Sequence, residues 1–205
     1  MKPIKIREEL LNRQIRIFTP EEFRRIFDIA PYQSKYFLET QVKEGLFVRL
    51  KKGLYALQTD IPSEEEIANK LYMPSYLSFE YALGYYNLIP EMPYTVTSAT
   101  AKPTRLFIVN GISYRYQSIK VEAFSGYMLK KSAHASFLIA EPEKALVDYL
   151  YFVALRKSAY SERLMQNLSD KGYYKTKGLE KKVIDRYADL YEMKKLDRLV
   201  AALFS

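Results

Sequence analysis

A short window of polar side chains between residues 32 and 44 has the chemistry needed to contact nucleic acid. It combines cations, amides, hydroxyls and aromatic rings, which are the groups that reach base edges and phosphates. Further along the chain, a Lys-Lys-Gly turn adds a compact positive charge. The candidate DNA-contacting residues are Gln33, Ser34, Lys35, Tyr36, Thr40, Lys43, Arg49, Lys51 and Lys52.

Two helices and a turn must position this window. The run from Thr19 to Glu22 predicts a helix start, because threonine caps the first-turn N–H groups and glutamate suits the positive end of the helix dipole. After a turn at residues 28–31, a second helix is expected from about Tyr32 to Glu44, ending at Gly45. Leu38 marks its inward stripe, so most of the polar window lies on the opposite face.

The segment from Leu46 to Leu57 predicts a hairpin with a cationic tip, in which Gly53 supplies a positive φ. A first helix over Ile4–Asn12 and a short strand over Gln14–Phe18 precede the helix pair. The order helix, strand, helix, turn, helix, basic-tipped hairpin is that of a winged helix-turn-helix. We therefore predict a DNA-binding domain over residues 1–59, with its second paired helix in the major groove.

Two other interpretations of this region stay open. A Lys-Lys-Gly turn is commonplace on protein surfaces, and winged helices also serve as protein-interaction modules. The order of the elements, together with positive charge at both proposed contact surfaces, favours DNA binding.

Composition supports an acidic partner and argues against several classes of protein. The net charge is +8, and residues 1–59 carry 12 basic against 7 acidic side chains. The absence of cysteine removes disulfides and thiolate metal sites and fits a reducing cytoplasm. Neither a signal peptide nor a membrane-spanning run is evident, so no membrane contact and a cytoplasmic location are expected.

Beyond residue 59 the pattern predicts a second, α+β domain over residues 60–205. The expected fold class is thus α+β, a winged helix-turn-helix followed by a mixed α/β C-terminal domain that ends in helices. Asn110-Gly111 is a strong hairpin signal. Strands are expected near residues 94–100, 106–109, 112–116 and 135–140. Helices are expected near 78–86, 142–153, 160–169, 179–191 and 193–204, and a further helix is expected to start at the cap formed by residues 63–66.

The chain offers no constellation of residues typical of an enzyme. It has no Gly-rich phosphate loop and no Asp-x-Asp magnesium motif. His134 has Ser132 and Ser136 nearby, but a surface histidine is the simpler interpretation. Nineteen tyrosines invite a base-stacking hypothesis, yet most fall at core positions. We expect neither enzymatic activity nor a cofactor or metal.

Several ordered motifs resemble the AbiEi-type antitoxins of abortive-infection toxin–antitoxin systems. The resemblance covers residues 14–152. In the N-terminal part it rests on Ile17-Phe18-Thr19 and on the segment from Gly45 to Leu57. In the second domain it rests on Tyr76–Leu83, Tyr86–Glu91, Val96–Thr100, Thr104–Phe107, Tyr114–Tyr116, Phe124–Tyr127 and Ala140–Asp148.

The resemblance implies a bacterial antitoxin that binds inverted repeats in its own promoter and represses its operon. It further implies that the C-terminal domain counteracts a nucleotidyltransferase-like toxin without a stable complex, in a phage-defence setting. Such a protein is expected to be a monomer in solution and to pair on double-stranded DNA. The third helix carries Tyr36 and Glu39 where the family often has basic residues, so no operator sequence transfers. An orphan regulator without a toxin, and a protein- or RNA-interaction module, remain alternatives.

Overall fold

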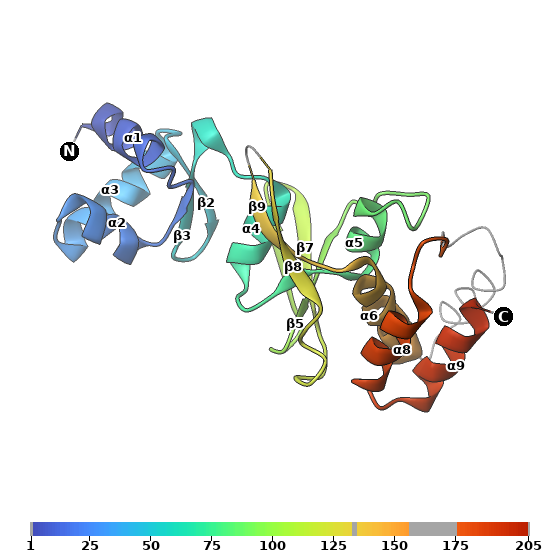
Figure 1. Ribbon diagram of the computed structural model, residues 1–205. Coiled ribbons are helices and arrows are strands. Elements are labelled where there is room, and N and C mark those ends of the chain that lie inside the picture. The colour runs from blue at the N-terminus through green and yellow to red at the C-terminus, as the bar shows by residue number, and fades with distance from the viewer. Residues whose placement is uncertain (1, 133–134, 156–175, 205) are drawn as a thin grey trace. The chain divides into compact units, whose positions relative to one another are not determined.

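The computed structural model describes residues 2–132, 135–155 and 176–204, and within it the chain forms two compact units (Figure 1). The units are Met1–Leu71 and Tyr72–Ser205. Both combine helices with a sheet, which confirms the expected mixed α+β class. No helix of the described residues is long and apolar enough to cross a membrane. The helix expected at 160–169, and His134, lie outside these residues.

The first unit has the predicted order of elements. Its three strands form an antiparallel sheet in the order β1-β3-β2. The elements are α1 (Pro3–Asn12), β1 (Ile17–Phe18), α2 (Pro20–Phe27), α3 (Pro31–Lys43), β2 (Phe47–Lys51), β3 (Leu54–Leu57), η1 (Gln58–Asp60) and α4 (Glu64–Leu71).

Strand β1 is shorter than the predicted Gln14–Phe18. The backbone N–H of Gln14 donates to Leu11 O, and that of Ile15 donates to Leu10 O, so these residues still complete the end of α1. Gln14 has a left-handed φ of 56°. Because this geometry caps a helix and is incompatible with a strand, the strand begins only at Ile17.

The predicted start of α2 is confirmed by a capping box. The Glu22 N–H donates to Thr19 Oγ1 at 3.2 Å, and the Thr19 N–H donates to Glu22 Oε2 at 2.8 Å. The helix ends at Asp28, whose φ is 47°. Helix α3 starts one residue before the prediction, because Pro31 occupies a first-turn position where its missing N–H costs nothing.

An aromatic cluster forms the core of the first unit. Phe18 lies 5.2 Å from Phe47 between ring centroids, and Phe23 lies 5.8 Å from Phe37. These rings come from β1, α2, α3 and β2, so the cluster fixes α3 against the sheet. The remaining buried members are Ile6, Leu10, Leu38, Tyr55 and Leu57.

Helix α4 belongs to the first compact unit although it follows residue 59. The Arg16 guanidinium lies 2.8 Å from Glu66 Oε2 and 3.2 Å from Asp60 Oδ1. Arg16 also donates to the Ile61 carbonyl at 2.8 Å. These contacts tie β1 to the segment that enters α4, and α4 itself packs against β2.

The second unit is built on one six-stranded mixed sheet, in the order β6-β7-β5-β4-β9-β8. Pairs β5–β7 and β4–β9 are parallel and the other pairs are antiparallel. The strands are β4 (Tyr76–Leu77), β5 (Val96–Thr100), β6 (Arg105–Val109), β7 (Ile112–Ser118), β8 (Tyr127–Lys131) and β9 (Ser136–Ala140).

Two strands escaped sequence prediction for physical reasons. Strand β4 has only two residues, which is too short for any periodicity. Strand β8 is an edge strand with no fully buried residue, so it carries little hydrophobic alternation. The Asn110-Gly111 turn is confirmed, with φ angles of 50° and 81° as a type I′ hairpin requires.

Helices α5 (Phe79–Tyr85) and α6 (Pro142–Leu155) pack together beside the sheet, and α8 (Lys181–Asp189) and α9 (Lys194–Leu203) pack on α6 (Figure 1). Tyr187 of α8 packs close to Gly126, where a Cβ would come within 2.6 Å of the tyrosine ring. The Tyr187 hydroxyl donates to Glu141 Oε2 at 2.6 Å. The last helices are therefore docked through specific contacts at one end of the sheet.

Candidate nucleic-acid interface

Helix α3 presents a polar face that the core does not use. Phe37 and Leu38 are buried in the aromatic cluster. Lys35, Tyr36 and Lys43 are exposed, and Tyr36 reaches 75%. The helix thus keeps its apolar side inward and leaves two cations and an aromatic ring free for a ligand.

Three other candidates on α3 have more restricted positions. Gln33 is exposed, but its Oε1 accepts from the Ala30 N–H at 3.3 Å, so its side-chain NH₂ group is what remains for a ligand. Thr40 is half-buried. Ser34 is fully buried, because its position falls on the side of the helix that faces the core. Its hydroxyl is out of reach of any ligand on the polar face, and we leave Ser34 out of the proposed interface.

The three basic residues of the hairpin differ in their exposure to solvent. Arg49 and Lys52 are exposed, the first on β2 and the second in the turn before Gly53. Lys51 is half-buried, and its Nζ donates to the carbonyl of Leu71 at 2.6 Å. Leu71 ends α4, where carbonyl groups lack helical partners and a cation is favourable. Lys51 therefore anchors α4 to β2.

Some other cations of the first unit are also held by contacts within the fold, whereas the candidate cations are not. Arg13 is paired with Glu9, and Arg16 is held by Asp60 and Glu66. Within the part of the chain that the structure describes, Lys35, Lys43, Arg49 and Lys52 form no ion pair. We use the name free-cation set for these four residues. Their charge is available for phosphates.

Exposure adds two residues that the sequence interpretation missed. Tyr32 is 72% exposed in the first turn of α3 and lies one helical turn before Tyr36. Arg25 of α2 is exposed as well. Two features of the sequence could have pointed to these residues. Tyr32 is an aromatic residue at a helix start with no apolar neighbour to pack on. Arg25 lies one position outside the apolar stripe of Phe23 and Phe27.

The different surroundings of two adjacent lysines lead to a prediction. Lys51→Ala should lower the free energy of unfolding of the first unit by about 1 kcal/mol, because the α4 carbonyl loses a charged donor. Lys52→Ala should leave stability unchanged within about 0.5 kcal/mol, because Lys52 is exposed. Urea unfolding followed by circular dichroism measures both. Equal stability of the two variants would contradict the anchoring role of Lys51.

A cluster of polar and charged side chains lies in the core of the second unit. Asp148 of α6 accepts from Tyr76 at 3.0 Å and from Ser78 at 2.7 Å, and it also accepts from Tyr191. Lys144, one turn earlier, forms an ion pair with the same carboxylate. Lys144 and Asp148 are both completely buried. The network joins β4, the start of α5, α6 and Tyr191, which follows α8 by two residues.

This buried network is suited to holding elements together and has no access for a substrate. Every member is less than a tenth exposed, and every charge has a partner inside the network. Among the described residues, no three His, Asp or Glu side chains gather as a metal site. The only signal in the sequence was a Lys and an Asp four residues apart on an otherwise apolar helix.

Burial of the phenol groups makes the second unit sensitive to alkaline pH. Burial, and then the Asp148 carboxylate, raise the pKa of Tyr76 and Tyr191 well above the usual value. Burial, and then Tyr85, raise the pKa of Tyr86 to about 12. Since the folded state keeps protons that the unfolded chain releases above pH ~10, this stability is complete below that pH and is lost as pH rises.

We therefore expect the free energy of unfolding to fall above pH ~10 by about 1.4 kcal/mol per pH unit for each buried tyrosine. Urea unfolding at a series of alkaline pH values measures the slope. Tyr191→Phe should reduce the slope by about one proton. Tyr94→Phe is the matched control, because Tyr94 is fully exposed, and it should leave the slope unchanged. A slope that Tyr191→Phe does not alter would contradict the assignment.

The first unit is thus a mixed α+β module in which an exposed helical face and a basic hairpin share one core. Residues 6–58 match the family model described as "Transcriptional regulator, AbiEi antitoxin". The resemblance to the AbiEi family is thereby confirmed over this stretch, and it supports a general role as an antitoxin-type regulator of transcription. No curated protein matches the chain.

Proposed function

We propose that the first unit is a winged helix-turn-helix that binds operator DNA and represses the operon that encodes this chain. The observation that carries the proposal is the placement of the free-cation set on α3 and on the β2–β3 hairpin, in the stretch that matches a family of transcriptional regulators.

In this proposal α3 enters the major groove and the hairpin is the wing. Lys35 and Lys43 contact phosphates, while Gln33 and Tyr36 face the base edges. The first turn of α3 has no side-chain cap from Ala30, so its backbone N–H groups are available to an adjacent phosphate oxygen. Arg49 and Lys52 then contact the backbone beside the groove.

Two copies on an inverted repeat would explain how a small module selects a promoter. A single recognition helix reads few base pairs, and paired half-sites one helical turn apart double the number of contacts. We propose that the chain is a monomer in solution and pairs on DNA.

Fluorescence anisotropy with the DNA upstream of the chain's own gene tests the proposal. The protein should bind this fragment at least about 100-fold more tightly than a shuffled duplex of equal length and composition. Binding should weaken steeply with salt. Equal affinity for both duplexes would overturn operator recognition, and no affinity for either would favour a protein- or RNA-interaction module.

We further propose that the second unit counteracts a nucleotidyltransferase-like toxin without forming a stable complex. The family description of the first unit as an antitoxin supports this part of the proposal. Co-expression of the chain with a toxin encoded by the neighbouring gene should restore growth, while size-exclusion chromatography should separate the two proteins. Growth arrest that persists on co-expression, or the lack of such a gene, would favour an orphan regulator.

A further inference from the structure

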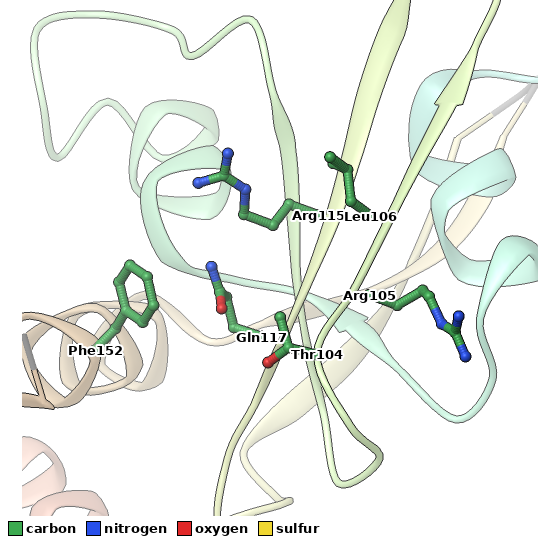
Figure 2. A pocket seen from close by; sticks show the side chains of 6 residues that line it. All are labelled: Thr104, Arg105, Leu106, Arg115, Gln117 and Phe152. Carbon is green, nitrogen blue, oxygen red and sulfur yellow. The ribbon is translucent and has the colours of Figure 1, made fainter.

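The second unit contains a cavity on the part of its sheet that lies at the β6 edge. Its volume is about 480 Å³, within the range of small-molecule sites. Figure 2 shows the six residues that line it. They come from β6 and the residue before it, from β7, and from α6: Thr104, Arg105, Leu106, Arg115, Gln117 and Phe152.

One arginine of this cavity is available to a ligand. Arg115 is paired in register with Leu106 of β6 and with Thr97 of β5, and its side chain points to the face on which the cavity lies (Figure 2). Among the described residues it has no ion pair. An exposed guanidinium in a hollow favours an anion, and its planar fork fits the oxygens of a phosphate.

The wall opposite the strands is aromatic. Phe152 of α6 lines the cavity from the helix beside the strands (Figure 2). Its ring lies 5.9 Å from that of Phe79, which is buried, so the core of the unit holds the ring in place. Leu106 adds an apolar surface that is 52% exposed. A flat apolar group can therefore lie between an aromatic ring and an aliphatic side chain.

The floor of the cavity carries hydrogen-bonding groups between these two features. Gln117 follows Arg115 by two residues, so both side chains lie on the same face of β7. Its amide offers a donor and an acceptor together. Thr104 Oγ1 accepts from the Ser118 N–H at 3.3 Å, which orients the hydroxyl and leaves its proton free to donate.

We propose that this cavity binds a nucleoside monophosphate. The phosphate pairs with Arg115, the base stacks on Phe152, and the polar edge of the base meets the Gln117 amide. A mononucleotide carries a negative charge, a flat ring and a polar edge, and the cavity offers a partner for each of them. The site is separate from the proposed DNA interface and does not depend on it.

Isothermal titration calorimetry of the full chain with the four ribonucleoside monophosphates tests the proposal. At least one should bind with a Kd below about 1 mM. Adenosine without phosphate and inorganic phosphate without a base are the dissecting probes, and each should bind at least about tenfold more weakly than the best mononucleotide. If phosphate alone binds as tightly as every mononucleotide, the base has no subsite and the proposal is wrong.

Two arginines of the second unit supply a matched pair of variants. Arg115→Gln should weaken mononucleotide binding at least about tenfold, because it removes the charge that pairs with phosphate. Arg198→Gln removes the same charge from α9, where Arg198 is exposed and does not line the cavity, and affinity should change less than about twofold. Phe152→Leu keeps apolar volume, removes the ring and should also weaken binding.

A variant of the proposed DNA interface distinguishes mononucleotide binding from operator binding. A protein with the two exposed lysines Lys35 and Lys52 replaced by alanine should keep its mononucleotide affinity, even if it no longer binds DNA. Equal losses in Arg115→Gln and Arg198→Gln would indicate attraction by overall charge alone and would overturn the proposal. The absence of any heat of binding with all four mononucleotides, confirmed by ligand-observed NMR, would overturn it as well.

Discussion

Replacing Asp148 by leucine should lower the free energy of unfolding of the second unit by about 3–5 kcal/mol, enough to unfold a marginally stable domain. The change leaves the Lys144 ammonium in a completely buried position without its counter-ion. It also removes the acceptor of Tyr76, Ser78 and Tyr191 at once. A buried charge without a partner is among the most costly defects that one substitution can create.

Lys144→Met should lower the free energy of unfolding less than Asp148→Leu does, because the Asp148 carboxylate has more hydrogen-bond partners than the Lys144 ammonium. In Lys144→Met the Asp148 carboxylate keeps three hydroxyl donors. In Asp148→Leu the ammonium keeps only the Tyr191 oxygen at 3.1 Å and the faces of two tyrosine rings, among the contacts shown for it. Hydrogen bonds to the charged group offset part of its desolvation, so the carboxylate tolerates the loss of its partner better.

The double variant Lys144→Met/Asp148→Leu serves as the matched control. It removes both charges together and should recover the part of the loss that comes from the unpaired ammonium, while the cost of leaving the Tyr76, Ser78 and Tyr191 hydroxyls without their acceptor remains. Urea unfolding followed by circular dichroism gives the three values. A loss below about 1 kcal/mol in Asp148→Leu would show that the network does not join these elements as described.

Replacing both Lys35 and Lys52 by alanine should weaken operator binding by about one to two orders of magnitude and reduce the slope of log affinity against log salt by about 2. Both side chains are exposed, one on α3 and one at the hairpin tip. Because lysine contacts to phosphate carry no sequence information, the loss should be similar for operator and shuffled DNA. The ratio of the two affinities should therefore stay nearly constant.

Lys2 and Lys5 provide the control for this pair. They are also exposed lysines of the first unit, but they lie at the start of α1 and outside the proposed interface. Their double alanine variant has the same net charge as the first and should change the salt slope by less than about 0.5. Equal slopes for the two double variants would mean that overall charge attracts DNA, and the assignment of α3 and the hairpin would be wrong.

Local sequence signals were sufficient for most of the first unit. The Thr19–Glu22 cap, the Gly45 terminator and the Gly53 turn each act within a few residues, so the chain specifies them before any tertiary contact forms. The apolar stripe of α3 likewise determined which of its faces is free. These features predicted the order of elements, and with it most of the exposed candidate residues; Ser34, which is buried, and Lys51, which is half-buried, are exceptions.

Those two residues differ in what the local pattern could show. Ser34 precedes Phe37 by three residues and Leu38 by four, so helical spacing alone places it on the buried side, and only its polar type made it a candidate contact. Lys51 looks identical to Lys52 in sequence. Its ammonium is held by the end of α4, a contact between residues 20 positions apart that no helical or strand period encodes.

In the second unit the sequence by itself determined the Asn110-Gly111 hairpin and the helices that lie within the described residues, while tertiary structure decided the sites. The buried ion pair gathers a strand, two helices and Tyr191, which is 43 residues from Asp148. The cavity likewise unites β6 and β7 with Phe152 of α6. Sheet order and helix docking depend on long-range burial of apolar surface, which short-range preferences do not specify, and these contacts alone bring such distant residues together.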